Sequence, residues 1–299
     1  METHPWDVRQ AVCTILDSRM QRRFTPFDVA DWSASAVIFA PHPDDETLGC
    51  GGVAAKKLAS GVEVRFVFVT DGAASHPTLM DPQGLRAKRE DEALEAVHRL
   101  GGSSESVQFL RFPDGSASRQ IREITKAIVP LLRAFKPQSV FVTHAKDPPC
   151  DHVAVNTALR AAAADYGRPL TVFEYPVWYW YHWPWVRARN DLPRMWRTTL
   201  QQTIKTAAGL RALSTLNRLA HVGGVIDVKR QALAAHVSQT QRLGGGDEWR
   251  ILSDLSGGDF VARLLSDYEM FTRYELNTHH TGMRGGPSSG GTFHGRLRC

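Results

Sequence analysis

The 299-residue chain lacks the features that define several protein classes. No apolar run approaches the roughly 18 residues of a membrane-spanning helix, and the first twenty residues lack the basic start and long apolar core of a signal peptide. The four cysteines are scattered, at Cys13, Cys50, Cys150 and Cys299, and they predict neither a disulfide framework nor a paired CxxC zinc site. Internal repeats are also missing. These absences predict a cytoplasmic globular protein.

Excess positive charge is small overall but locally concentrated. The chain has 36 Lys and Arg against 31 Asp and Glu, a net charge of +5, yet residues 187–230 alone carry nine basic residues against two aspartates. This basic stretch lacks helix-turn-helix signals and stacking aromatics of a nucleic-acid-binding module, so no nucleic-acid partner is expected. Two interpretations of the basic stretch remain: ordinary solvated helices, which we favour, or a site for an anionic ligand.

Short apolar runs alternate with amphipathic stretches through the first two thirds of the chain. This alternation predicts βαβ units and an α/β, Rossmann-like, doubly wound and mostly parallel sheet of order 3-2-1-4-5 with helices on both faces. The predicted strands cover residues 35–41, 63–70, 106–112, 139–143 and 170–175, and the predicted helices between them cover 47–60, 85–100, 119–135 and 152–166. Residues 49–52 do not match the pattern G-x-G-x-x-G, and acidic residues crowd that turn, so a dinucleotide cofactor is not expected.

Four segments are expected along the chain. They are a lead-in helix in 1–34, a core domain over 35–240 with an aromatic and basic insertion at 178–225, a C-terminal helical extension over 241–280, and a disordered, glycine-rich tail over 281–299. Helices are predicted at 196–221, 227–240 and 258–273.

The strongest chemical signal follows the first predicted strand. Residues 42–46 read His-Pro-Asp-Asp-Glu, which places one imidazole and three carboxylates where open α/β sheets bind ligands. One of the aspartates could cap the following helix, but helix capping does not explain the whole set. The composition indicates a site for a divalent cation.

A second polar cluster follows the fourth predicted strand, from His144 to His152. In the predicted strand order this strand lies beside the first, so the clusters meet. His42, Asp45 and His152 would then form a His₂Asp site, the three-ligand arrangement of catalytic zinc. Asp44 would face the metal-bound water and accept its proton.

The motifs together resemble the PIG-L (LmbE-like) family. The resemblance covers residues 35–239 and rests on PHPDDETLGCGG, VTDG, the Arg89-x-x-Glu92 pair, FPDG, Asp151-His152 and AHVSQ at 235–239. Members of this family are mostly zinc-dependent de-N-acetylases that act on N-acetylglucosaminyl conjugates. The resemblance implies a Zn²⁺ cofactor, with other divalent metals as alternatives.

The resemblance also implies roles for single residues. His42, Asp45 and His152 match the metal ligands, and Asp44 matches the general base. Arg89 and Asp114 match substrate-binding positions, although a helical pair with Glu92 and a turn before Gly115 are alternatives from the sequence. Asp151 is expected to support the metal ligands from behind.

One position departs from the family pattern. Family members commonly carry a histidine three residues before the third ligand, where it stabilises the oxyanion, and this chain has Pro149. Loss of such a donor typically costs about 10²–10³ in rate. We expect nearby His144 to take over this catalytic role, with metal polarisation alone or weakened activity as alternatives.

The sequence therefore predicts hydrolysis of an N-acetyl group on a sugar conjugate with an anionic or lipid aglycone. Alternatives are a weak or inactive sugar-binding relative and a metal hydrolase of another amide. The aromatic run at 178–185 could shape the aglycone pocket, pack internally, or join the basic stretch in a membrane-surface contact, which is not favoured. A homo-oligomer is compatible with the sequence.

Overall fold

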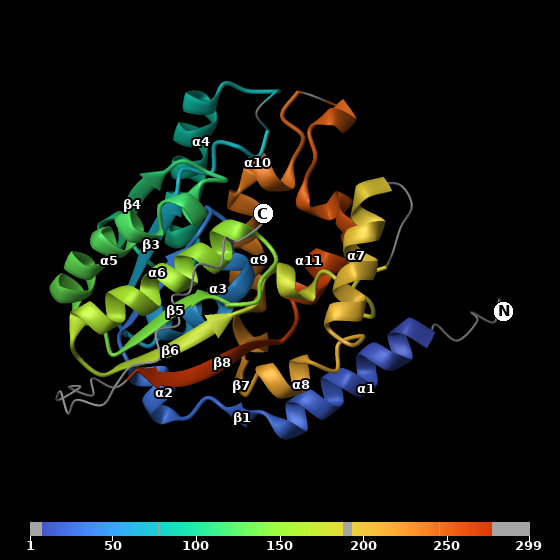
Figure 1. Cartoon of the computed structure of the whole chain (residues 1–299), viewed down its shortest axis with the longest axis horizontal. Helices are drawn as coiled ribbons and strands as arrows, with labels where there is room; N and C mark the ends of the chain where they lie inside the picture. Colours follow the sequence, from blue (N-terminus) through green and yellow to red (C-terminus); the bar gives the residue numbers. More distant parts are fainter. Residues whose placement is uncertain (1–7, 77, 188–192, 245, 277–299) are drawn as a thin grey trace, which may run out of the picture.

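A single mixed sheet forms the centre of the molecule (Figure 1). The computed structural model describes residues 8–76, 78–187, 193–244 and 246–276. Eight strands lie in the order β1-β7-β8-β6-β5-β2-β3-β4. Their bounds are β1 Thr25–Pro26, β2 Ala36–Ala40, β3 Val64–Thr70, β4 Val107–Phe112, β5 Ser139–Thr143, β6 Leu170–Tyr175, β7 Arg218–His221 and β8 Tyr268–Leu276. The pairs on both sides of β2 and β5 are parallel, and β8 is antiparallel to both β6 and β7.

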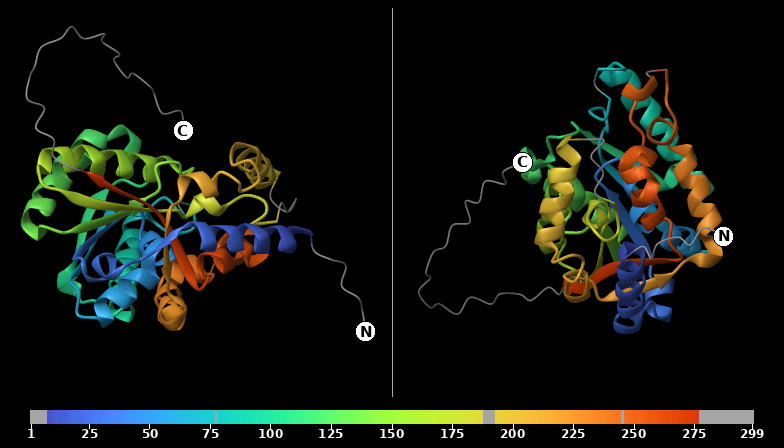
Figure 2. Two further views of the ribbon diagram at one scale, coloured as in Figure 1. Left: turned by 90° about the horizontal axis from the view of Figure 1, so that it is seen from below. Right: turned by 90° about the vertical axis from the view of Figure 1, so that its right-hand side faces the viewer.

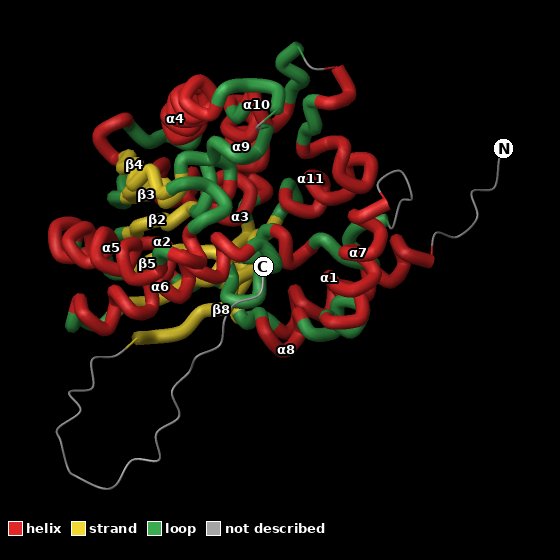
Figure 3. Tube along the Cα trace, turned by 45° about the horizontal axis from the view of Figure 1, so that its top comes forward, coloured by secondary structure: helices red, strands yellow, loops and turns green. Residues whose placement is uncertain are grey.

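Helices cover both faces of this sheet (Figures 2 and 3). The helices are α1 Val8–Arg23, α2 Val29–Ser33, α3 Asp45–Ala59, α4 Pro82–Arg99, α5 Ile121–Phe135, α6 Cys150–Tyr166, α7 Pro193–Lys205, α8 Ala212–Thr215, α9 Ile226–Ala235, α10 Val237–Thr240 and α11 Asp259–Leu264. Short 3₁₀ segments include η3 Trp178–Trp180 and η6 Leu252–Gly258. Among the described residues, no helix combines the length and the apolarity that crossing a membrane requires.

Alternation along the central strands builds two separate cores. Val37 and Phe39 of β2 pack with the apolar faces of α5 and α6, whereas Ile38, between them, points to the opposite core with α3 and α4. Successive side chains of a strand point to opposite faces, so a strand buried on both faces is apolar at every position. The predicted α/β class with a mostly parallel sheet is confirmed.

The C-terminal third differs from its prediction as a helical extension. The helix expected at 258–273 ends at Leu264, and Tyr268–Leu276 form strand β8 inside the sheet. The helix expected at 196–221 divides into α7, α8 and strand β7. Segment β8 reads YEMFTRYEL, whose aromatic and β-branched residues favour a strand once partners exist on both sides. Those partners, β6 and β7, are remote in sequence. The predicted tail at 281–299 lies outside the described residues.

Helix α3 is broken at Cys50, whose φ of −146° and ψ of 20° interrupt the helical hydrogen bonding. The freed N–H groups of Gly52 and Val53 donate to the Glu269 carboxylate at 2.8 and 2.9 Å. Lys229 of α9 neutralises this buried carboxylate at 2.7 Å. Strand β8 and helix α9 therefore fix α3, whose first turn carries the acidic motif.

Candidate metal centre

Two polar loops meet at the carboxyl ends of neighbouring strands. Residues 42–46 follow β2, and residues 144–152 follow β5, which pairs directly with β2. Loops after β3 and β4 add Gly72 and Asp114 to the same edge. The parallel register brings together residues that are more than 100 positions apart in the sequence, such as His42 and His152.

Three potential metal-binding atoms converge at this edge. The Asp45 Oδ2 atom lies 3.2 Å from His42 Nδ1 and 3.2 Å from His152 Nε2, and the two nitrogens are 3.3 Å apart. A tetrahedral zinc with ligand distances of about 2.0–2.2 Å has donor atoms about 3.3–3.5 Å apart. The spacing and the chemistry of this donor set therefore fit a zinc-type cation.

Further carboxylates orient both imidazoles. His152 Nδ1 lies 2.7 Å from Asp147 Oδ2, and Asp147 also accepts backbone N–H bonds from residues 177–179. His42 Nε2 lies 3.1 Å from Asp114 Oδ1 and 3.4 Å from Asp151 Oδ2. Carboxylates behind metal-binding histidines fix the ring orientation and the tautomer. Asp147 lies in the second polar cluster, but its contact with His152 was not predicted from the sequence.

His42, Asp114 and Asp151 form a second group whose donor atoms lie within 4.8 Å of one another. In this group Asp151 is already engaged, because it accepts N–H bonds from Gly115 at 2.7 Å and Ala117 at 3.0 Å. Its carboxylate therefore ties the loop after β4 to the start of α6, and its supporting role at the metal stays a prediction.

The surrounding charges stabilise positive charge at the centre. Burial would lower the pKa of His152, but Asp45 and Asp147 raise it to about 9. Burial likewise opposes charge on His42, yet Asp114, Asp151 and Asp45 raise its pKa well above the usual range. The pKa of Asp45 is lowered, because His152 and His42 outweigh the effect of burial. A site that favours cationic imidazoles in this way is suited to a bound dication, which displaces those protons.

Asp44 lies beside the three donors in a strained backbone conformation. Its φ of 134° is in a region that residues with a side chain rarely adopt, and its N–H donates to Glu46 Oε2 at 2.9 Å. Such strain concentrates at functional sites. Burial raises the pKa of Asp44 to about 6, although Arg89, 3.4 Å away, opposes the shift. Asp44 is therefore placed as a proton acceptor near neutral pH.

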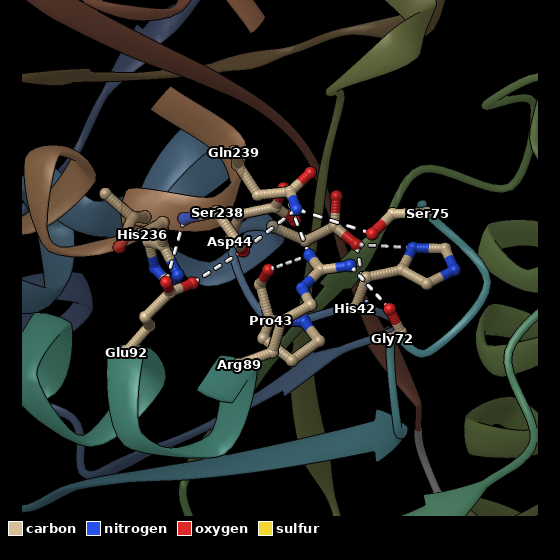
Figure 4. A network of polar contacts seen from close by, with 12 residues as sticks. His42, Pro43, Asp44, Gly72, Ser75, Arg89, Glu92, His236, Ser238 and Gln239 are labelled. Carbon is tan, nitrogen blue, oxygen red and sulfur yellow. Dashed lines mark hydrogen bonds and ion pairs between the residues drawn. The ribbon is translucent and has the colours of Figure 1, made fainter. Parts of the chain in front are cut away.

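Arg89 and Asp114 both line the same cavity, but their contacts differ. Figure 4 shows Arg89 with Pro43 and Gly72. Arg89 donates to the carbonyls of Gly72, at 3.1 Å, and Pro43, and these bonds hold the loops after β2 and β3 together. Asp114 accepts the Ala74 N–H at 3.0 Å, and its pKa falls to about 2 because His42 outweighs burial. Both residues have a structural role in addition to the predicted substrate contact.

The AHVSQ motif forms a further support that the sequence analysis left without a role. His236 Nε2 lies 2.8 Å from Glu46 Oε1, and the backbone N and Oγ of Ser238 donate to Glu92 at 2.8 and 2.7 Å. Gln239 lines the cavity (Figure 4). This motif thus joins α10 to the acidic loop and to α4. The sequence signal for this role was the cluster of His, Ser and Gln at the end of a predicted helix.

The structure does not bring His144 to the cavity. Its Nδ1 accepts the Lys146 N–H at 3.1 Å, its Nε2 lies 3.9 Å from Glu174, and its ring packs against Tyr179. Burial lowers the pKa of His144. By contrast, Pro149 lines the cavity, so the position of the expected oxyanion donor is close to the centre but carries no donor group.

A cavity of about 270 Å³ opens beside the donor set. Its lining residues come from the segments after β2, β3, β4, β5 and β6, from helices α3, α4 and α10, and from the start of η6. They are His42, Asp44, Asp45, Leu48, Ala74, Ser75, Arg89, Asp114, Pro149, Trp178, Gln239 and Leu252. Small-molecule sites typically combine such convergent polar groups with an apolar surface.

Comparison with known proteins finds a family match over this part of the chain. The PIG-L family model, described as GlcNAc-PI de-N-acetylase, matches residues 37–163, which contain both clusters. The predicted resemblance to the PIG-L (LmbE-like) family is confirmed over this range.

Two curated deacetylases are similar to the chain over most of their length. The chain is 27% identical to 1D-myo-inositol 2-acetamido-2-deoxy-alpha-D-glucopyranoside deacetylase 2 of Saccharopolyspora erythraea, over 83% of this chain and 93% of the relative. It is 24% identical to a deacetylase of the same description from Rhodococcus jostii, over 72% of this chain and 85% of the relative.

Solved structures support the fold. The N,N'-diacetylchitobiose deacetylase of Pyrococcus horikoshii is 19% identical, with a TM-score of 0.54 over 92% of this chain and 94% of that chain. The A40926 pseudoaglycone deacetylase Dbv21 is 20% identical, with a TM-score of 0.55 over 82% and 98% of the two chains.

Proposed function

We propose that this chain is a metal-dependent hydrolase that removes the N-acetyl group from an N-acetylglucosaminyl-type sugar conjugate. The convergence of His42, Asp45 and His152 within 3.3 Å, with Asp44 beside them, carries this proposal. The names of the similar proteins support a deacetylase acting on amino-sugar derivatives. Zn²⁺ is the proposed cofactor, because two imidazoles and one carboxylate form a typical catalytic zinc site.

His42, Asp45 and His152 would hold the metal. A bound divalent cation polarises the acyl carbonyl and lowers the pKa of water to about 7. Asp147 and Asp114 keep the two imidazoles aimed at the centre, and Arg89 holds Asp44 within the cavity wall.

Asp44 supplies the proton transfers. Its carboxylate takes a proton from the water that attacks the acyl carbon, and its protonated form returns that proton to the leaving amine nitrogen as the C–N bond breaks. The products are acetate and the free amino sugar. We assign no acid or oxyanion role to His144, because it does not line the cavity.

The test is release of acetate from methyl N-acetylglucosaminide by the zinc-loaded protein. We expect acetate and a free amine in equal amounts, and Asp44→Ala should keep the metal while losing nearly all turnover. Binding of the sugar without acetate release would instead support a non-catalytic sugar-binding protein, which the missing donor at Pro149 makes the second candidate.

A further inference from the structure

The cavity beside the metal centre is lined by two chemically different sets of residues. One set is polar and carries the five charged or ionisable residues His42, Asp44, Asp45, Arg89 and Asp114, called the polar wall below. The apolar lining includes Pro149, Trp178 and Leu252, which come from the loop after β5, from η3 and from the start of η6. These three residues, called the apolar wall below, have no part in the proposed proton transfers.

Trp178 is held in place before any ligand arrives. Its ring centroid lies 5.0 Å from that of Phe260 and 5.7 Å from that of Tyr181. Its backbone N–H donates to Asp147 Oδ2 at 3.2 Å. Most of the other aromatic residues of the run are buried in the core: Tyr179, Trp180, Tyr181 and Trp185. Trp178 is half-buried and lines the cavity, so its ring offers a rigid apolar surface there.

The charges of the cavity offer no surplus cation to an anionic substituent. Its three carboxylates, those of Asp44, Asp45 and Asp114, face a single guanidinium, that of Arg89, and a bound divalent cation only brings their sum to zero. None of the described residues of the basic stretch lines the cavity. An anionic aglycone would therefore find no unbalanced positive charge among the described lining residues, whereas an uncharged apolar group meets Trp178 and its neighbours.

We propose that the apolar wall is a subsite for an uncharged, apolar substituent of the substrate, next to the sugar. This inference rests on the proposed function, because the polar wall is taken to hold the N-acetyl sugar. Pro149, three residues before His152, contributes an apolar ring to the same cavity as the three candidate metal ligands. The same chemistry could belong to an apolar aglycone or to an N-acyl chain longer than acetyl.

Equilibrium binding separates these two sources. The probes are methyl N-acetylglucosaminide, its octyl glycoside analogue, and the methyl glycoside that carries an N-octanoyl group, each titrated calorimetrically into the zinc-loaded full chain. The test variants are Trp178→Ala and Leu252→Asn, and the second keeps the test intact if the first is unstable. Ile204→Ala, at a residue of α7 that is 71% exposed, serves as the matched control.

We expect one octyl compound to bind at least about tenfold more tightly than the methyl N-acetyl compound, a gain that burial of roughly 60 Å² of apolar surface supplies. Both wall variants should lose most of this preference, and Ile204→Ala should retain it. The compound that shows the gain identifies the source: the octyl glycoside indicates an apolar aglycone, and the N-octanoyl compound indicates a longer acyl chain.

All chains in the titration also carry Asp44→Asn, which removes the proposed turnover, so the affinities are independent of acetate release by the wild type. Equal affinity of the chain with an unaltered apolar wall for all three compounds would overturn the subsite, as would a preference that both wall variants retain. A preference without acetate release from any compound contradicts the proposed function and leaves the subsite in place, whereas acetate release without a preference does the reverse.

Discussion

Asp147 provides a sensitive test of how the metal centre is held. Its Oδ2 lies 2.7 Å from His152 Nδ1 and also accepts N–H bonds from Val177 and Trp178, and its Oδ1 accepts the N–H of Tyr179. Both oxygens are therefore acceptors. In Asp147→Asn the new NH₂ group must face one of these donors, and the negative charge behind the imidazole is lost.

We expect Asp147→Asn to weaken zinc binding by about 10–100-fold, the usual effect of changing a group behind a metal ligand. This factor corresponds to about 1.4–2.8 kcal/mol. The lower limit applies if the amide oxygen stays toward His152, and the upper limit if the NH₂ group turns toward it. Competition with a chromogenic chelator at fixed pH measures the zinc affinity directly.

The matched control is Asp165→Asn, because Asp165 is an exposed residue near the other end of α6. This variant should bind zinc as the wild-type protein does. A zinc affinity of Asp147→Asn within twofold of the wild type, with the fold intact, would refute the reasoning that Asp147 holds His152 for a metal.

Three further predictions concern the scaffold. Lys229→Met should lower the free energy of unfolding by about 3–5 kcal/mol, because the buried carboxylate of Glu269 loses its partner. Arg230→Met, at an exposed residue, should change it by less than about 1 kcal/mol. Urea denaturation compares the two variants, and equal free energies of unfolding would contradict the prediction. Gly49→Ala should lower the free energy of unfolding by about 1–3 kcal/mol, because the new Cβ would lie 2.1 Å from the buried ring of Tyr175. Gly224→Ala should be tolerated, because no atom lies within 4 Å of its new Cβ. Thermal unfolding compares the two variants, and an unchanged stability of Gly49→Ala would contradict the close contact. Burial lowers the pKa of His182 from 6.5 to about 4, so the unfolded state binds more protons between these values and stability should fall by about 3 kcal/mol as pH drops from above 6.5 to below 4. His182→Gln should reduce this dependence in urea unfolding at pH 7 and pH 4.5, and an unchanged slope would count against it.

The sequence was sufficient to predict the central strands and the convergence of the three candidate metal ligands. Strands 36–40 and 139–143 are short and mostly apolar, and the polar clusters follow them directly, so local pattern predicted their convergence. The prediction that His42, Asp45 and His152 meet depended on the pairing of these two strands alone. The structure brings their donor atoms together.

The C-terminal third was less predictable because its partners are remote in sequence. Strand β8 is stabilised by pairing with β6 and β7, and its buried Glu269 is compatible with a core position only because Lys229 and two freed helix N–H groups meet it there. None of these partners is visible in the local pattern. Likewise, His144 was expected near the centre from its place in the sequence, but the turn after β5 directs it toward Glu174.

The structure also decides between the sequence-based interpretations of the aromatic and basic residues in 178–230. Most of the described aromatic rings complete the core beside β6 and α11, whereas Trp178 reaches the cavity. None of the described basic residues of this stretch lines the cavity, and most of them are exposed, as expected of solvated helices. Lys229 is an exception, because it is buried against Glu269.

The central claim is that Asp44 transfers protons beside a metal held by three other residues. The most direct measurement is acetate release by Asp44→Asn together with its zinc content by elemental analysis. We expect one zinc per chain, as in the wild type, and turnover reduced by at least about 10²-fold. Wild-type turnover in Asp44→Asn with zinc still bound would contradict proton transfer by Asp44.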